Sequence, residues 1–119
     1  MSEFNELIKE SKPTLVDFYA TWCGPCRMQS PIIEKVKEEI GDAANVIKVD
    51  IDKNEAVARK YNVQSIPTLI MFKNGEPAWR AVGLQQADVL VAKIKEFIYK
   101  SFSFSVLLLF IDKSASLWR

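Results

Sequence analysis

Histidine is absent from this chain of 119 residues. Its absence excludes Ser-His and Cys-His catalysis, and it also excludes metal ligation by imidazole. A surplus of charge is missing as well, because sixteen basic and fifteen acidic side chains give a formal net charge of +1. This balance argues against nucleic acid as a partner and against a strongly acidic partner surface.

The sequence also lacks the patterns that direct a chain to a membrane. Its opening residues, MSEFNELIKESKP, carry three acids and no long apolar run, unlike a secretory signal. Near the other end, the apolar residues 106–111 are far fewer than the ~20 needed to span a bilayer. We therefore expect a cytoplasmic protein without a membrane partner.

Composition is typical of a folded globular domain, with 49% apolar and 26% charged residues. A chain of this length can bury roughly two-thirds of its unfolded surface, so its core needs no metal or disulfide. The pattern changes after residue 100. We therefore expect one domain over residues 1–100 and a hydrophobic extension over residues 101–119.

Apolar periodicity predicts an α/β fold in which a mixed sheet is covered by helices on both faces. Residues 14–20 form an almost continuous apolar run, typical of a strand buried on both faces. Asn74-Gly75 lies between two strand patterns and is a strong hairpin signal. The expected elements are a helix near 4–8, strands at 14–20 and 45–51, helices at 25–40 and 55–61, strands at 68–73 and 77–82, and a helix at 87–100.

Two further predictions concern side chains on the expected helices. Asn54 precedes the helix at 55–61 and is predicted to cap it. The helix at 25–40 is predicted to bury one apolar stripe, formed by Met28, Ile32, Ile33, Val36 and Ile40.

Both cysteines, Cys23 and Cys26, lie in one tetrapeptide with Gly24 and Pro25 between them. The tetrapeptide falls where the buried strand ends and the long helix begins, so Cys23 is expected at the helix N-terminus. Free N–H groups and the helix dipole there favour a thiolate by ~0.3–2 kcal/mol, which lowers the pKa of a thiol by roughly one unit. A disulfide across two residues closes almost no loop, and a metal site with two thiolates would need a second chain. Thiol–disulfide exchange is therefore the favoured chemistry.

Two residues outside the tetrapeptide, Asp17 and Lys48, allow more than one interpretation. Asp17 lies inside the apolar strand, where it is either an edge residue that reaches water or a buried base with a raised pKa that accepts the Cys26 proton. Lys48, on the next strand pattern, either tunes that charge or is solvated. For Ile66-Pro67, base rates favour a trans turn, because only ~5–6% of X-Pro bonds in folded proteins are cis.

Taken together, these residues resemble the thioredoxin family. The similarity covers roughly residues 3–100, and several separated motifs agree in order and spacing. The matching positions are the WCGPC motif at 22–26, Asp17, Pro31, Lys48, the IPT motif at 66–68, Asn74-Gly75 and Gly83.

The resemblance implies a thioredoxin fold, with a central sheet of about four strands, and reduction of protein disulfides by dithiol exchange. It implies that Cys23 is the attacking thiolate and Cys26 the resolving thiol, with Asp17 as the buried base and Lys48 beside it. The Cys23–Cys26 pair is then the redox-active disulfide, and neither a metal nor a further cofactor is expected.

For substrate binding, the resemblance implies a cis Pro67 that packs against the disulfide and an Ile66 backbone that pairs with an extended substrate. It also implies a flat apolar rim on which partner proteins dock. Disulfide-containing proteins would be the substrates, and a thioredoxin reductase would restore the dithiol. The rim positions are Trp22, Gly24, Pro25 and Gly83.

The chain departs from the family pattern in three places. Tyr19 stands where many members have tryptophan, the usual first strand is missing, and residues 101–119 follow the last helix. Without that strand, residues 46–51 would form an exposed sheet edge. One hypothesis is that part of 102–111 pairs with this edge, within one chain or by exchange in a homodimer. The alternative is an incidental extension that promotes association.

Two other classes of function remain open. A binding module without redox activity would use the same apolar rim, and it would keep its function after both cysteines were replaced. A dimeric metal or cluster protein would contain metal at one equivalent per two chains.

Overall fold

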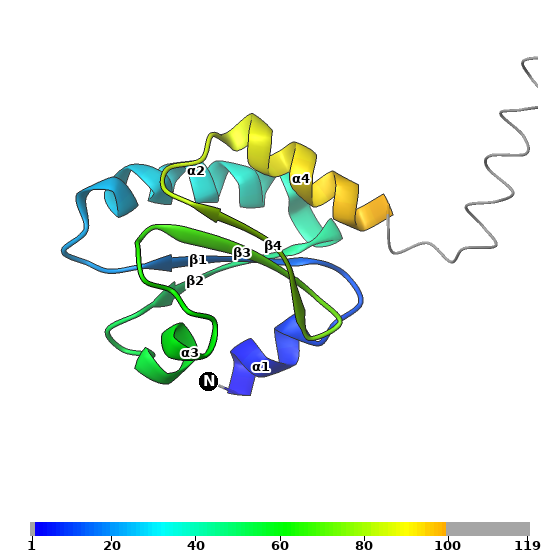
Figure 1. The fold of residues 1–119 in the computed structure, drawn as a ribbon. Helices are drawn as coiled ribbons and strands as arrows, with labels where there is room; N and C mark the ends of the chain where they lie inside the picture. Colours follow the sequence, from blue (N-terminus) through cyan, green and yellow to red (C-terminus); the bar gives the residue numbers. More distant parts are fainter. Residues whose placement is uncertain (1, 100–119) are drawn as a thin grey trace, which may run out of the picture.

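Residues 2–99 are described by a computed structural model of the chain (Figure 1). Within these residues, the strands form one mixed sheet in the order β2-β1-β3-β4. The predicted α/β fold with about four strands is therefore confirmed. In chain order, the elements are α1 (Ser2–Ile8), β1 (Thr14–Tyr19), α2 (Gly24–Ile40), the 3-10 turn η1 (Gly41–Ala43), β2 (Asn45–Asp50), α3 (Glu55–Lys60), β3 (Thr68–Lys73), β4 (Glu76–Val82) and α4 (Ala87–Tyr99).

Strand β1 lies inside the sheet, parallel to β2 and antiparallel to β3. This position explains why its sequence is apolar on both faces rather than alternating. Strands β3 and β4 form the predicted hairpin, and its turn residues Asn74 and Gly75 have φ values of 55° and 85°. Positive φ at both positions is what a tight two-residue hairpin turn requires, and Asn-Gly supplies it at little steric cost.

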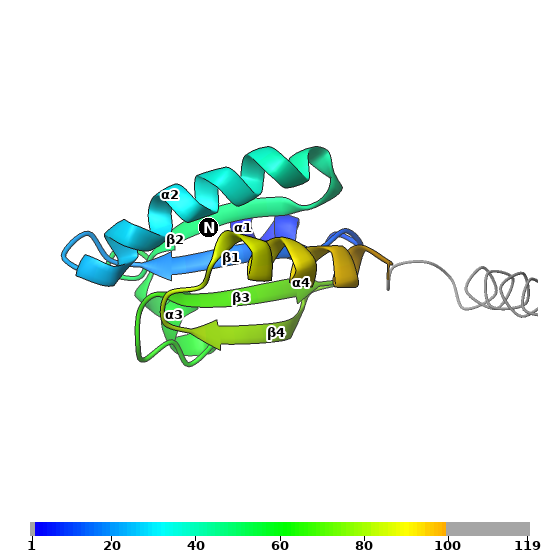
Figure 2. The same ribbon diagram turned by 90° about the horizontal axis from the view of Figure 1, so that it is seen from above.

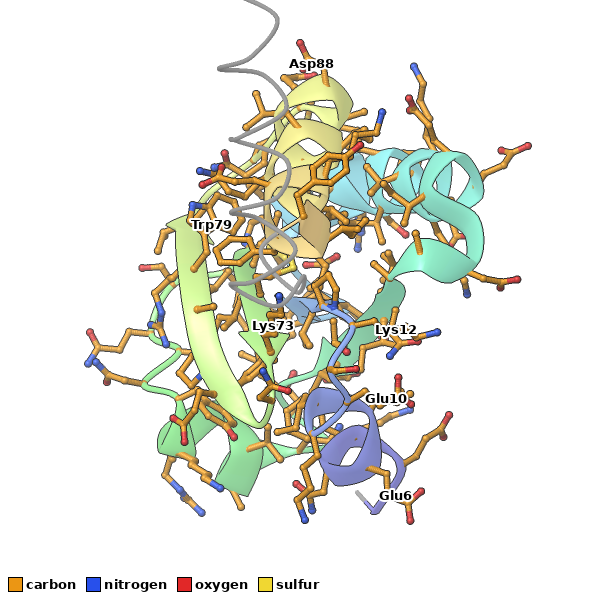
Figure 3. The ribbon with its side chains drawn as sticks, turned by 90° about the vertical axis from the view of Figure 1, so that its right-hand side faces the viewer. Glu6, Glu10, Lys12, Lys73, Trp79 and Asp88 are labelled. Carbon is orange, nitrogen blue, oxygen red and sulfur yellow. A yellow bond between two sulfur atoms is a disulfide. The ribbon has the colours of Figure 1, made fainter. Side chains whose placement is uncertain are left out.

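The helices cover both faces of the sheet, with α2 and α4 on one side and α1 and α3 on the other (Figures 1 and 3). Alternate residues of β1 serve the two layers: Leu15 packs with α2 and α4, whereas Val16 and Phe18 pack with α1 and α3. Trp79 of β4 lies on the α4 side, against the same core as Leu15 (Figure 3). Asp17, two residues after Leu15, therefore faces the layer that contains α2.

The buried stripe of α2 differs from the prediction. Met28 is 61% exposed, whereas Gln29 is fully buried. The buried face follows spacings of three and four residues, and Met28 lies about 100° around the helix from Gln29. The prediction placed the apolar Met28 in the core, whereas the structure buries the polar Gln29 next to it. The buried residues of α2 are Cys26, Gln29, Ile33, Val36 and Ile40.

The predicted side-chain cap by Asn54 is wrong. Asn54 occupies the position before α3, but its side chain makes no capping bond to that helix. The Asn54 Nδ2 atom instead donates to the Asp50 carbonyl oxygen at 3.0 Å. Asparagine side chains commonly bond to nearby backbone, and here that competing bond closes the loop between β2 and α3.

Strand β2 lies at an edge of the sheet, as predicted, with β1 as its neighbour among residues 2–99. In the same range, no helix is long and apolar enough to cross a bilayer. The predictions for residues 101–119, namely a separate extension, pairing of 102–111 with the edge and a homodimer, lie outside the described residues.

Ile94 offers a test of the interface between α2 and α4. This side chain is fully buried in the core that both helices share. We expect Ile94→Ala to lower the free energy of unfolding by about 2–5 kcal/mol, because it leaves a cavity. In the control Val89→Ala, on the same helix, the native side chain is 46% exposed. That change should alter stability by about 0.5 kcal/mol or less. If urea denaturation showed the same loss of unfolding free energy for both variants, the burial of Ile94 between α2 and α4 would be contradicted.

Candidate active site at the start of helix α2

Cys23 is the N-cap residue of α2 and immediately precedes the first helical residue, Gly24. The backbone N–H of Cys26 donates to the Cys23 Sγ atom at 3.2 Å. The two sulfur atoms are joined in a disulfide. Exposed fractions are 5% for Cys23 and 3% for Cys26, so only a small part of either cysteine reaches solvent. A sulfur at this position receives the N–H groups that the first helical turn cannot pair internally.

The cysteines lie against the loop that precedes β3. Ile66 packs on the small cluster formed by Ala20 and both cysteines. Its carbonyl oxygen is 3.8 Å from the Cys23 Sγ atom. The Ile66-Pro67 bond is cis, as the family resemblance predicted. The structure therefore brings Cys23 and the Ile66-Pro67 dipeptide together from segments more than forty residues apart.

Gly83 joins the same site from the end of β4. Its N–H donates to the Pro67 carbonyl oxygen at 2.8 Å, and its φ is 89°. This conformation favours glycine, because a side chain would be strained there.

Near the disulfide, Trp22, Gly24 and Pro25 are exposed, as a docking rim requires. Trp22 is 66% exposed, but its ring is held in place. The indole Nε1 donates to Asp52 Oδ2 at 2.8 Å. Sequence reasoning did not identify Asp52, which lies in the loop after β2, because a lone acidic loop residue gives no pattern that relates it to Trp22.

Asp17 is fully buried, and neither carboxyl oxygen has a hydrogen-bond partner. Burial raises the pKa of Asp17 from 3.8 to about 6, and the positive charge of Lys48 opposes part of that rise. The edge interpretation of Asp17 is wrong, since β1 has a neighbour on each side. A carboxyl group with such a pKa is suited to accept and release a proton near neutral pH.

Lys48 is the register partner of Asp17 on β2. Its ammonium donates to Ser30 Oγ at 2.7 Å and lies 4.6 Å from the centre of the Tyr19 ring. Because the Asp17 oxygens have no hydrogen-bond partner, Lys48 acts on Asp17 through space rather than by direct pairing. Tyr19 and Ser30 therefore position the lysine, a role that the sequence patterns did not reveal.

The family model for thioredoxin matches residues 1–96. The chain belongs to the thioredoxin family. A thioredoxin-like protein of Synechocystis sp. is 47% identical over 98 residues, which cover 82% of this chain and 93% of that protein. The thioredoxin of Staphylococcus saprophyticus is 44% identical, with coverage of 82% and 92%. Among solved structures, a variant thioredoxin from Halobacterium salinarum superposes with a TM-score of 0.75 at 39% identity and covers 82% of this chain and 85% of its own.

As a member of the thioredoxin family, the chain is a thiol–disulfide oxidoreductase that acts on protein disulfides, with Cys23 and Cys26 as its redox pair. Among residues 2–99, no three or more side chains of His, Cys, Asp or Glu are grouped so as to hold a metal ion.

Asp17→Asn tests the protonation of the buried carboxyl. The raised pKa means that the folded protein binds this proton more tightly than the unfolded chain, so wild-type stability falls as pH rises from about 4 to 6. The variant lacks this loss. We therefore expect its stability relative to wild type to increase by about 3 kcal/mol between about pH 3.5 and 7.5. Urea denaturation of the oxidised proteins measures this, and a pH-independent difference would contradict it.

Lys48→Met tests the opposing charge. Because Lys48 lowers the pKa of Asp17, its loss should raise that pKa above the wild-type value of about 6. NMR titration of the Asp17 carboxyl carbon in the oxidised protein measures the shift directly. The control Lys53→Met removes an exposed lysine outside the pairing with β1 and should leave the Asp17 titration unchanged. A lower midpoint in Lys48→Met would refute the electrostatic assignment.

Proposed function

We propose that this protein works mainly as a reductase of protein disulfides, with Cys23 as the attacking sulfur and Cys26 as the resolving sulfur. The observation that carries the assignment is the hydrogen bond from the Cys26 N–H to Cys23 Sγ, at 3.2 Å. This bond and the positive end of the α2 dipole both stabilise negative charge on Cys23. Neither effect acts to the same degree on Cys26, which lies inside the helix.

A thiolate on Cys23 would be well matched to this reaction. The dipole of a helix contributes up to ~2 kcal/mol to a partly buried charge at its N-terminus, equivalent to a pKa decrease of roughly one unit. Such a thiol is substantially ionised near neutral pH and remains a good nucleophile. Cys23 is also flanked by the exposed residues Trp22 and Gly24, where a substrate sulfur can approach.

The exchange takes place in two balanced steps. The Cys23 thiolate attacks one sulfur of the substrate disulfide, forms a mixed disulfide and releases the other substrate sulfur as a thiolate. Cys26 then loses its proton to Asp17 and attacks Cys23 Sγ. This step closes the Cys23–Cys26 disulfide and releases the second substrate thiolate, so two electrons have passed to the substrate.

Asp17 suits the second step because it carries no competing hydrogen bond. With a pKa of about 6, it is mostly a carboxylate at neutral pH and is still basic enough to accept a proton. In the reduced protein, the two thiols and Asp17 are expected to titrate as a coupled set rather than independently.

The same proposal covers binding and partners. Trp22, Gly24, Pro25 and Gly83 form the rim on which a protein substrate docks, and the Ile66 backbone pairs with its extended chain. A thioredoxin reductase returns the site to the dithiol, and no other cofactor takes part. Since net reduction requires a reducing compartment, the proposed location is the cytoplasm.

A trapping experiment tests the two sulfur roles. When mixed with a disulfide protein such as insulin, Cys26→Ser should accumulate a mixed disulfide through Cys23, because no thiol is present to resolve it. Cys23→Ser should accumulate none. Non-reducing electrophoresis with mass spectrometry identifies the linked cysteine, and the reverse pattern would reject the assignment.

Two further measurements separate reduction from the other functions. Equilibration with glutathione buffers gives the direction of exchange, and a strongly oxidising pair would contradict the reductase proposal. The double variant Cys23→Ser and Cys26→Ser should lose all disulfide reduction. Full biological function in that double variant would instead indicate a binding module.

A further inference from the structure

Gln29 is the one polar residue among the buried residues of α2 in the described structure. It lies three positions after Cys26 and is fully buried. A primary amide is costly to bury unless its donor and acceptor groups are paired. The contacts of its side chain therefore indicate what the residue does.

Both ends of the Gln29 amide bind one residue of another segment. Gln29 Nε2 donates to the Gln85 carbonyl oxygen at 3.0 Å, and the Gln85 N–H donates to Gln29 Oε1 at 2.8 Å. The side chain thus pairs with the Gln85 backbone as a neighbouring strand would. This paired arrangement holds the Gln85 peptide in both position and orientation.

Gln85 lies in the connection between β4 and α4, two residues after Gly83, and this connection runs beside α2 (Figure 2). The Gln85 side chain donates to the Gly83 carbonyl oxygen at 3.2 Å. The N–H group of Gly83 in turn donates to the Pro67 carbonyl oxygen. A continuous series of hydrogen bonds therefore links the active-site helix to the cis-proline loop through Gly83.

We infer that Gln29 is a positioning residue for protein-substrate binding, and this inference rests on the proposed docking role of Gly83. Gln29 fixes the Gly83 segment relative to the two cysteines, so the rim is already in its binding geometry before a substrate arrives. A preformed rim lowers the ordering cost of association. Small disulfides need no rim and should be insensitive to Gln29.

Gln29→Met tests this role, because methionine has a similar length and removes both hydrogen bonds. With dithiothreitol as electron donor, we expect the KM for insulin to rise about three- to tenfold, the factor for losing about one net hydrogen bond. The kcat should stay within about twofold, since the cysteines and Asp17 are untouched. The rate with the small disulfide DTNB should not change. Faster amide hydrogen exchange at Gln85 would accompany the KM effect.

Two further variants make the result specific. Gln64→Met is the matched control, because Gln64 is exposed and its side chain bonds to Asn62. It should leave the KM for insulin unchanged. In Gln29→Glu, a protonated carboxyl can both donate and accept, so its KM relative to wild type should improve as pH falls, whereas that of Gln29→Met should not.

The outcomes separate this inference from the proposed function. If wild type reduces both insulin and DTNB but Gln29→Met has an unchanged insulin KM, the positioning role is wrong. The inference would also be overturned if Gln29→Met reduced insulin and DTNB more slowly by the same factor. The same holds if the KM of Gln29→Glu for insulin did not improve relative to wild type as pH falls. If wild type reduces neither substrate, the reductase function itself fails.

Discussion

The turn between β1 and α2 determines the chemistry of this protein. Strand β1 is inside the sheet and packs on both faces, so its end is held rigidly, and α2 begins after four connecting residues. Cys23 is thereby placed where backbone N–H groups have no helical partner, and the Cys26 N–H donates to its sulfur. The cis-proline loop and Gly83 then pack or bond around this fixed point. The core holds the turn in a fixed position, and the N-terminus of α2 stabilises negative charge on Cys23.

Asp17 shows that the same core is not built for stability alone. A buried carboxyl without hydrogen bonds opposes folding whenever it is ionised. The same burial raises the pKa of Asp17 to about 6, which is close to neutral pH. Lys48 moderates this cost from a distance, because Ser30 and Tyr19 hold its ammonium. The interior therefore contains one unfavourable group, which accepts the Cys26 proton in the exchange reaction proposed above.

Sequence reasoning was most successful where the relevant physics is local. The strand and helix order, the Asn74-Gly75 hairpin and the cysteine pair at the helix N-terminus follow from periodicity, turn chemistry and short spacing. It failed where distant segments decide the outcome. Met28 was assigned to the core in place of Gln29, since the partner of Gln29 lies 56 residues away. The cis state of Pro67 came from family resemblance, because local propensities favour trans.

The position of Lys48 on the edge strand β2 has a second consequence, which is unrelated to redox chemistry. Within residues 2–99, one side of β2 has no neighbouring strand, and such an edge is a template for pairing with another molecule. Lys48 places a charge in the middle of this strand, where stacking of identical chains would bring like charges together. The residue that lowers the pKa of Asp17 therefore also charges this edge of the sheet, and such a charge disfavours pairing between identical edges. A neutral residue at position 48 would raise the pKa of Asp17 and would also remove this charge from the edge, so the two effects change together.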